Sequence, residues 1–557
     1  MEPDQRIRTK ITPLIILAFA VHILLLLSVL DIYFTSPLEH GMIHHRANIS
    51  NPPARRLVLL LADGLRASAL FNKDMPTATP FLYSIKENEG AWGIAHTQVP
   101  TESRPGHIAI FAGFYEDPSA IFKGWRDNPV DFDTVINQST KSVCFGSPDI
   151  VNMFNKYNYS HITSYYYDPL MEDFSGKWKS VVLDQWVMEH SKKYIQSGRL
   201  SGSQDGVIVF LHLLGIDTAG HSFKPVSMEY KLNIEELDKE INLFVKFFTN
   251  YFHDNDTAFI FTSDHGMTDW GSHGAGSKDE TEVPFIAWGS GIPKTAERHD
   301  LNLTDIAPLI SALLGINFPT NSLGITPLHF LNAPIKDTAQ IVYANALQLY
   351  ELFMAKEKKI KKNPIVVFKP FYKLPKEKLI GWKSYMEDLF QMENYQEVIK
   401  FTENVINNLV EGIKYYNSYF QIYLSLLSTL AFIGWLLYLI SWLPIFSNVY
   451  SSIGTGDWNY HNIKEKPLSV VFLFLNVIGF VISRAMGFIY YYTLYVLFPM
   501  ASWYLVYLRS NYMRLLYNWL MQFKVRTLLS FAITYGIGTE MLVSCFLFNK
   551  TKSRCGI

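Results

Sequence analysis

Short apolar runs alternate with longer amphipathic stretches between Arg56 and about Phe330. Runs that are apolar on both faces are typical of strands covered by helices on either side, as in parallel sheets. Five runs fit this description and predict buried strands: Leu57–Ala62, Ser142–Phe145, Val207–Leu214, Phe259–Thr262 and Pro284–Trp288. Apolar residues at helical spacing predict three helices: Pro80–Asn88, Glu229–Asn250 and Thr304–Leu314, the last with Thr304 or Asp305 as its N-cap. This alternation predicts an α/β domain with a doubly wound, mainly parallel sheet.

The N-terminal segment from Ile11 to Leu30 carries no charged residue over about 20 positions, which is long enough to span a bilayer. A signal peptide would have a shorter apolar region and a cleavage site of small residues. We therefore expect an uncleaved anchor. Arg6, Arg8 and Lys10 precede it, which predicts a cytosolic N-terminus and places the following domain across the membrane.

Four further apolar stretches follow the central region, at about 418–442, 467–484, 486–507 and 527–548. The loop 508–526 carries Arg509, Arg514, Lys524 and Arg526, and the loop 448–466 carries Lys464 and Lys466. Counting spans from a cytosolic N-terminus places both loops in the cytosol. Glu540 lies inside the last stretch, where an ionisable group is a candidate functional residue. Pairing with a neighbouring helix, or a shift of the span, explains Glu540 equally well.

These patterns divide the chain into four parts. They are an N-terminus with its anchor (1–34), a lumenal α/β domain (35–335), a helical stem (336–415) and a membrane domain of about four helices (416–557). The Lys356–Lys362 run in the stem predicts a solvated helix face rather than a binding patch.

Composition supports a membrane protein, because 49% of the 557 residues are hydrophobic and 15% are aromatic. The formal net charge of -1 argues against a nucleic-acid partner, which would require a basic surface. Only Cys144 of the three cysteines lies in the central region, so cysteine usage does not indicate a compartment. Five sequons fall in the predicted lumenal domain and are candidate glycosylation sites: Asn48, Asn137, Asn158, Asn255 and Asn302.

Carboxylates and histidines stand where apolar runs end. Asp63 follows the first strand, although an Asp-Gly pair after a strand is commonly just a turn. Asp217 and His221 are four residues apart, so they can converge on one cation if their segment is helical. Asp264 and His265 follow another strand, and His273 comes eight residues after His265. Ligands beyond the carboxyl ends of strands are typical of α/β enzymes, and we expect a metal site there.

The mixture of carboxylate and imidazole suits two Zn²⁺ ions, and suits Mn²⁺ less because histidines make up half of the set. Two metals about 4 Å apart can stabilise both the attacking and the leaving oxygen of a displacement. Thr101, in VPTESRPGH, is the candidate nucleophile, since an apolar helical stretch follows and a helix N-terminus favours an anion. The alternative is that Thr101 only caps that helix.

Together, the segments ADGLRA, PTESRPGH, GIDTAGH, SDHGM and GSHGAGSKDETEVPFIAWGSGI resemble the alkaline-phosphatase superfamily. More narrowly, residues 1–335 resemble the glycosylphosphatidylinositol (GPI) ethanolamine phosphate transferases, and in particular the group that acts on the first mannose. The resemblance implies that Asp63, Thr101, Asp264 and His265 bind one zinc, with Thr101 also the nucleophile. It implies that Asp217, His221 and His273 bind the second zinc.

The resemblance also implies the reaction and its place. Phosphoethanolamine would pass from phosphatidylethanolamine to mannose of the GPI precursor, through a phosphothreonine-type intermediate, at the endoplasmic reticulum membrane. Related phosphodiesterases hold a phosphate oxygen with an asparagine that has no close counterpart after Thr101; Arg104 and His107 are candidates for that role, and a structural role for each is an equal alternative. Members of the family continue through many more spans, so we expect this chain to be a truncated form. Two other readings are a metal-dependent phosphodiesterase and an inactive variant with a regulatory role.

Overall fold

The computed structural model describes residues 3–33, 36–116, 132–155, 158–172, 175, 179–200, 205–362, 368–442, 468–485, 490–510 and 517. These residues form two compact units. One comprises 36–356 and 371–414, and the other comprises the N-terminal helix, 357–370 and the chain from 415 onward. The predicted fourth membrane stretch at 527–548, Glu540, the loop 448–466 and nearly all of the loop 508–526 lie outside the described residues.

The first unit is built on an eight-stranded sheet in the order β4-β3-β5-β1-β6-β7-β2-β8. The strands are β1 (Arg56–Ala62), β2 (Gly90–His96), β3 (Lys141–Gly146), β4 (Ile162–Tyr166), β5 (Val207–Leu213), β6 (Thr257–Thr262), β7 (Glu282–Gly289) and β8 (Leu301–Asn302). Every pairing is parallel except those of β7 with β6 and β2. The predicted mainly parallel α/β sheet is confirmed, and all five predicted strands are present.

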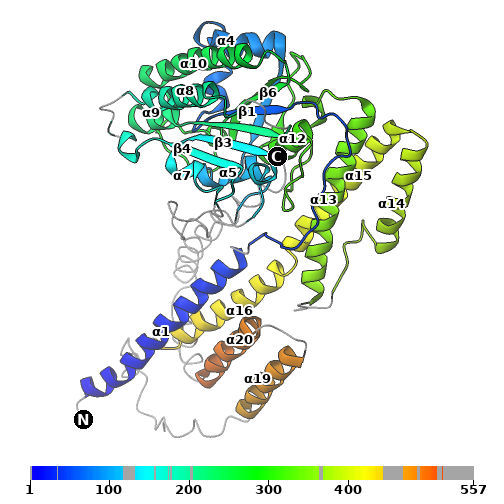
Figure 1. Ribbon diagram of the computed structural model, residues 1–557. Helices are drawn as coiled ribbons and strands as arrows, with labels where there is room; N and C mark the ends of the chain where they lie inside the picture. Colours follow the sequence, from blue (N-terminus) through cyan, green and yellow to red (C-terminus); the bar gives the residue numbers. More distant parts are fainter. Residues whose placement is uncertain are drawn as a thin grey trace. The chain divides into compact units, whose positions relative to one another are not determined.

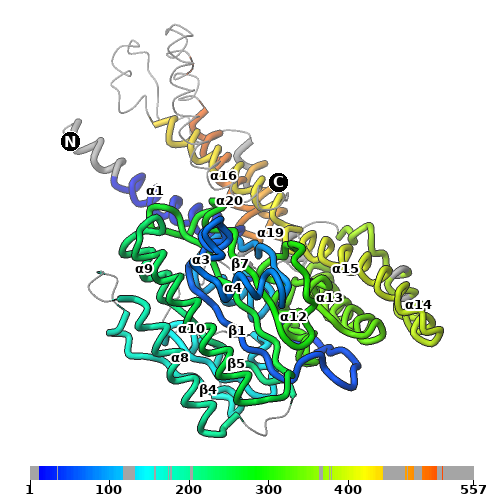
Figure 2. Tube along the Cα trace, turned by 90° about the horizontal axis from the view of Figure 1, so that it is seen from above, coloured from blue at the N-terminus to red at the C-terminus, as the bar shows by residue number. Residues whose placement is uncertain are grey.

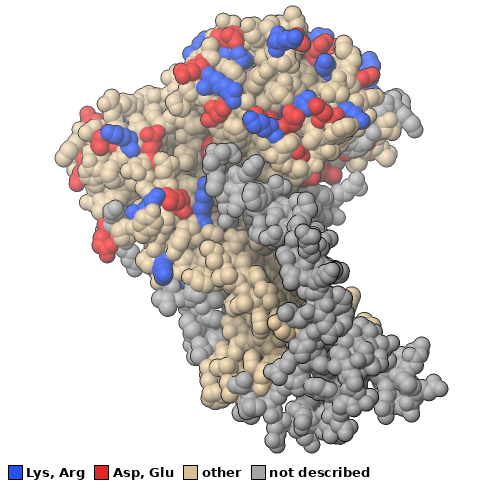
Figure 3. Space-filling view, turned by 180° about the vertical axis from the view of Figure 1, so that it is seen from behind, with Lys and Arg blue, Asp and Glu red and all other residues tan. Residues whose placement is uncertain are grey.

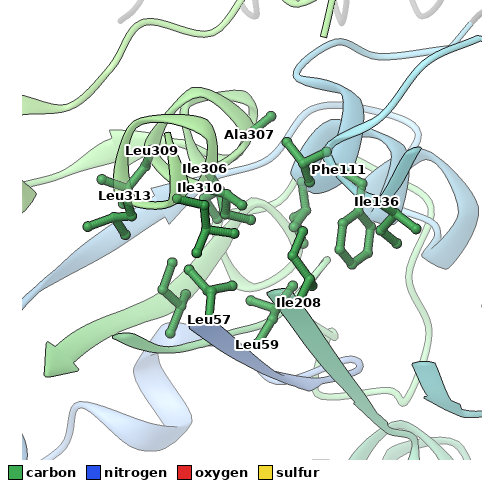
Figure 4. Close-up of a cluster of buried hydrophobic side chains, with 14 of the residues drawn as sticks. Leu57, Leu59, Phe111, Ile136, Ile208, Ile306, Ala307, Leu309, Ile310 and Leu313 are labelled. Carbon is green, nitrogen blue, oxygen red and sulfur yellow. The ribbon is translucent and has the colours of Figure 1, made fainter. Parts of the chain in front are cut away.

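Helices cover both faces of this sheet (Figure 1). On one face lie α8 (Val181–Gln196), α9 (Gly215–Phe223) and α10 (Met228–Phe252), with α8 and α10 side by side (Figure 2). On the other face lie α5 (Ser103–Ala112), α6 (Val135–Gln138), α7 (Pro148–Val151) and α12 (Ile306–Leu314). Most residues of β1 are apolar because helices cover both faces of the strand. Leu57 and Leu59 pack under α5 and α12 (Figure 4), whereas Val58 and Leu60 pack under the opposite helices.

Three strands were not predicted from the sequence. β2 and β8 lie at one edge of the sheet and β4 lies at the other, and their sequences mix polar and small residues with apolar ones. β8 and β4 are the two edge strands, and an edge strand has less surface to bury, so its apolar signal is weak. β2 pairs with β7 and β8, but the two glycines and the histidine in GAWGIAH interrupt its apolar pattern.

The predicted helices are present with shifted ends. Pro80–Asn88 is divided into α4 (Pro80–Ser84) and a π-helical turn (Ile85–Glu89). At the third helix, Asp305 is the N-cap by position but its carboxylate accepts from the backbone of Asn302 and Ile325. Asp305 therefore completes a capping box with Asn302 on the short turn Leu303–Asp305 instead of capping α12 with its side chain.

The stem region folds as three long helices: α13 (Ile335–Lys362), α14 (Lys376–Gln391) and α15 (Tyr395–Asn417). Aromatic rings join α13 to α14, with Tyr343 and Trp382 centroids 5.8 Å apart. The predicted solvated lysine face needs one correction. Lys356 is buried, and its ammonium pairs with Glu39 at 3.1 Å and donates to the Pro37 carbonyl, whereas the later lysines of the run are exposed.

The second unit contains α1 (Pro3–Tyr33), α16 (Gln421–Ile440), α19 (Leu468–Ala485) and α20 (Tyr490–Leu508). By length and composition, Thr12–Tyr33 and Tyr395–Ile440 could each cross a membrane. Val21 and Leu25 of α1 pack against Ala431 and Trp435 of α16. Gly434 of α16 lies against Ser502 of α20, the close approach that small residues allow between apolar helices.

The surface agrees with the near-zero net charge. Over the face shown in Figure 3, Lys and Arg side chains are interspersed with Asp and Glu rather than gathered by sign. Four of the five sequon asparagines are exposed, whereas Asn137 is half-buried and its side-chain oxygen accepts from the Thr134 hydroxyl at 2.7 Å. Glycosylation at these positions stays a prediction.

Candidate active site

The sheet order brings the predicted ligands together. Strands β5, β1 and β6 are adjacent and parallel, so their carboxyl ends lie at one edge of the sheet. Asp63 follows β1, α9 begins two residues after β5, and Asp264 follows β6 after one residue. Three segments that are far apart in sequence therefore meet where an α/β fold places its ligands.

Asp63, Asp264 and His265 form one fully buried group. The Nε2 atom of His265 lies 3.5 Å from Asp63 Oδ1 and 3.5 Å from Asp264 Oδ2. The potential ligand atoms of this group all lie within 4.8 Å of one another.

Asp217, His221 and His273 form a second group, which opens towards solvent at His221. Asp217 and His221 lie four residues apart on α9, and His221 Nε2 is 3.4 Å from Asp217 Oδ2. His273 arrives from the loop after β6 and places its Nε2 3.1 Å from that of His221. The helical spacing predicted for Asp217 and His221 is confirmed.

Each of the three histidines is oriented by a backbone carbonyl. The Nδ1–H groups donate to Gly266 from His265 (2.9 Å), to Gly271 from His221 (2.9 Å) and to Thr101 from His273 (2.8 Å). In the neutral rings, this arrangement directs the Nε2 lone pair of each histidine into its group. Histidines that bind metals are held in this way, because the second hydrogen bond fixes both the tautomer and the ring plane.

The buried carboxylates of both groups have the free oxygens and the concentrated negative charge that cations require. Among the described residues, the buried oxygens Asp264 Oδ2 and Asp217 Oδ1 have no hydrogen-bond partner. Burial, and then the nearby Asp63 carboxylate, raise the pKa of Asp264 well above its usual range and raise the pKa of Asp217 in the same direction. Burial lowers the pKa of His265, but the surrounding carboxylates outweigh it and raise that pKa to about 9. The protein therefore concentrates negative charge that metal ions would compensate.

Two glycines allow this crowding. A Cβ on Gly64, whose φ is +70°, would lie 2.7 Å from Asp217 Oδ1. A Cβ on Gly106 in α5 would lie 2.7 Å from the Cβ of Asp264. A side chain at either position would displace a ligand.

His212 of β5 is a further residue of this site that was not predicted from the sequence. The parallel register pairs His212 with Leu61, and its Nε2–H donates to Asp63 Oδ2 at 2.9 Å, while the Ser147 backbone N–H donates to its Nδ1 at 3.3 Å. His212 thus holds one oxygen of Asp63 and leaves the other facing His265. The signal in the sequence was a lone polar residue inside the apolar run VIVFLHLLG.

The Ser103 hydroxyl contacts the first group, whereas the hydroxyl of the predicted nucleophile Thr101 makes its hydrogen bonds elsewhere. Ser103 Oγ lies 3.4 Å from Asp63 Oδ1 and 3.3 Å from His265 Nε2. Ser103 is the first residue of α5, so the helix N-terminus favours an anion at its side chain. Ser103 was not predicted from the sequence, because a sequence pattern locates the start of a helix only to within one or two residues.

Thr101 occupies a different position. Its buried hydroxyl accepts from the Gly274 N–H at 2.8 Å and donates to the Ala275 carbonyl at 2.7 Å. Its carbonyl accepts from His273, as described above. Glu102 is the N-cap of α5 and no side chain caps that helix, so the alternative that Thr101 caps it is not borne out. Thr101 binds the loop that carries His273.

Both candidates for holding a phosphate oxygen make internal contacts. The Arg104 guanidinium pairs with Glu116 in a two-point contact, at 2.8 Å and 3.1 Å. His107 is fully buried, donates from Nδ1 to the Ser103 carbonyl at 2.7 Å, and has a pKa lowered by burial to about 3. These contacts support a structural role for both residues.

Two family profiles match separate parts of the chain. The sequence profile of the type I phosphodiesterase / nucleotide pyrophosphatase family matches residues 116–275, and that of phosphatidylinositolglycan class N (PIG-N) matches residues 411–555. The chain is 38% identical to GPI ethanolamine phosphate transferase 1 of Mus musculus over 96% of its own length and 34% identical to that of Saccharomyces cerevisiae over 90%. It covers 60% and 58% of those two proteins.

Among solved structures, a protein of the alkaline phosphatase superfamily from Vibrio parahaemolyticus shares 19% identity, with a TM-score of 0.40. That match covers 56% of this chain and 79% of the other.

Proposed function

Because this chain belongs to the family of the GPI ethanolamine phosphate transferases, we propose that it transfers phosphoethanolamine from phosphatidylethanolamine to the first mannose of a GPI precursor. The observation that supports this most is the convergence of three Nε2 atoms and three carboxylates on one strand edge, beside a hydroxyl at a helix N-terminus. The chain spans about 60% of the length of the relatives it matches, so the activity of those whole proteins is proposed for it.

We assign one metal ion to Asp63, Asp264 and His265 and a second to Asp217, His221 and His273. Two Zn²⁺ ions suit this donor set better than Mn²⁺. When bound, such a pair lowers the pKa of a nearby hydroxyl and stabilises the charge that develops on the attacking and leaving oxygens.

Four residues of the chain carry out or support bond formation. Ser103 is the nucleophile: its Oγ forms a bond to phosphorus while the bond from phosphorus to the diacylglycerol oxygen breaks. The proton of the Ser103 hydroxyl is held towards Asp63 Oδ1. His212 fixes the Asp63 carboxylate, and Thr101 fixes the loop of His273. The departing diacylglycerol oxygen takes up the proton that Ser103 gives up. A mannose hydroxyl then attacks the phosphorus, the bond from phosphorus to Ser103 Oγ breaks, and the proton of the mannose hydroxyl returns to Ser103.

The site of the covalent intermediate tests this scheme. The zinc-loaded full chain, in detergent, is incubated with phosphatidylethanolamine and digested, and the peptide that contains both hydroxyls is fragmented in a mass spectrometer. We expect a phosphoethanolamine adduct on Ser103 that persists in Thr101→Val and is lost in Ser103→Ala. An adduct on Thr101 would show that Thr101 is the nucleophile, as the sequence predicts. Full transfer by Ser103→Ala would show that no covalent intermediate on Ser103 is required.

Hydrolysis is the second candidate function, because the phosphodiesterase profile matches 116–275. In that case water takes the place of mannose. Free phosphoethanolamine without labelled GPI precursor would identify a phosphodiesterase.

We further propose an endoplasmic reticulum membrane location with the catalytic unit in the lumen. The support is the relationship to GPI-anchor enzymes and the two helices able to span a bilayer. Rescue of cells that lack the first-mannose transferase, with GPI intermediates analysed by mass, would test substrate and location together.

A further inference from the structure

Glu102 lies between Thr101 and Ser103 and has an unusual position for a carboxylate. It is the N-cap residue of α5, yet its side chain makes no capping hydrogen bond. The carboxylate lies instead against the loop after His273: Oε2 is 3.6 Å from His273 Nδ1, and Oε1 is 2.9 Å from where a Cβ on Gly274 would stand. Gly274, with φ of +112°, therefore leaves room for this carboxylate at the mouth of the site.

The contact with His273 does not satisfy the carboxylate. The Nδ1–H of that ring already donates to the Thr101 carbonyl at 2.8 Å, and 3.6 Å is longer than a hydrogen bond. The Glu102 side chain is 31% exposed, so it has lost part of its hydration. Among the described residues, no lysine or arginine forms an ion pair with it. A partly desolvated carboxylate in this state gains from a cationic hydrogen-bond donor.

Glu102 directly precedes the proposed nucleophile Ser103, so the cationic donor should belong to the substrate that reacts at Ser103. A phosphate diester whose phosphorus lies at Ser103 Oγ carries its head group on an O–C–C arm that reaches neighbouring side chains. The negative charge of Glu102 would repel an anionic or phosphate-rich group at the same position. A short arm that ends in a positively charged group with N–H donors can reach Glu102 from the phosphorus and is attracted by its negative charge.

We propose that Glu102 binds the primary ammonium of the phosphoethanolamine head group and so selects ethanolamine at this site. The inference rests on the proposed function. Its consequence is that discrimination depends on the amine of the donor, independently of the lipid tails.

Binding without turnover tests this inference. Isothermal titration of the zinc-loaded full chain compares phosphoethanolamine with ethyl phosphate, which has the same arm without the amine. A charge-assisted hydrogen bond predicts at least about tenfold tighter binding of phosphoethanolamine. The Glu102→Gln variant should lose most of the preference for phosphoethanolamine over ethyl phosphate. It should bind ethyl phosphate as tightly as the wild type does and should contain the same amount of zinc. Glu297→Gln, which removes an exposed carboxylate elsewhere, is the matched control and should keep the preference.

A second measurement uses the wild-type chain, so its result does not depend on whether the variant folds. Phosphocholine has no N–H donor, so it should bind about tenfold more weakly than phosphoethanolamine. Equal binding of the probes by the wild type would overturn the inference, as would loss of zinc from Glu102→Gln, because that residue would then act on the metal site. Failure of the proposed function would appear separately, as absence of any adduct on Ser103.

Discussion

His221 and His273 face each other with their Nε2 atoms 3.1 Å apart, while the Nδ1–H of each ring donates to a backbone carbonyl. In neutral rings both Nε2 atoms therefore carry lone pairs, which cannot hydrogen-bond to each other. A cation between them resolves the conflict. One residue comes from helix α9 and the other from the loop after β6, so a bound metal would join two elements of the fold.

Loss of one of these rings should remove one metal. We expect His273→Ala to bind about one zinc per chain instead of two, since the first group keeps all its ligands. Metal analysis of the purified protein by mass spectrometry measures this directly. His96→Ala alters a histidine on β2, outside both groups, and should retain two. Two zinc ions in His273→Ala would contradict the assignment.

His212 should affect metal affinity without touching the metal. Its Nε2–H holds Asp63 Oδ2, and loss of such an orienting partner typically weakens metal binding by about 10–100-fold. Competition with a zinc chelator should show this loss in His212→Ala. A smaller loss is expected in His212→Gln, whose amide can still donate. Equal, undiminished affinity in both variants would mean that Asp63 does not need His212.

Thr101→Val separates a role in the loop from a role in bond formation. Without the hydroxyl, the Gly274 N–H and the Ala275 carbonyl lose their partner, at a cost of about 1–3 kcal/mol. We expect a lower melting temperature and weaker zinc binding, with the adduct still formed on Ser103. An unchanged melting temperature together with complete loss of the adduct would instead favour Thr101 as the nucleophile.

Asp184 should make stability depend on pH. It is fully buried, and burial raises its pKa to about 7 despite the N–H of Gly215, which donates to it at 2.9 Å. Its folded pKa exceeds the unfolded value near 4, so its contribution to stability is complete below about pH 4 and is lost as pH rises towards 7, by at most about 1.4 kcal/mol per pH unit.

The Asp184→Asn variant isolates this effect, because the amide keeps the shape and does not titrate. Melting temperatures measured from pH 4 to 8 should fall less steeply in the variant than in the wild type. Parallel curves for the two proteins would show that Asp184 does not contribute.

The sequence alone determined the elements that carry the site. Apolar runs bounded by Asp-Gly, Gly-Ile-Asp and Ser-Asp-His located the ends of β1, β5 and β6, because a strand covered on both faces is mainly apolar. The helical spacing of Asp217 and His221 likewise followed from local periodicity.

Only the tertiary structure decided which of these ends meet and which hydroxyl enters the site. The sheet order β5-β1-β6 and its register place His212 beside Asp63, and no local pattern encodes that pairing. Thr101 and Ser103 are two residues apart and similar in chemistry. Their contacts differ because the loop after β6 binds the Thr101 hydroxyl, while α5 begins at Ser103 and the Ser103 Oγ lies 3.3 Å from His265 Nε2. Both outcomes depend on contacts between segments far apart in sequence, which the residues of either segment cannot specify alone.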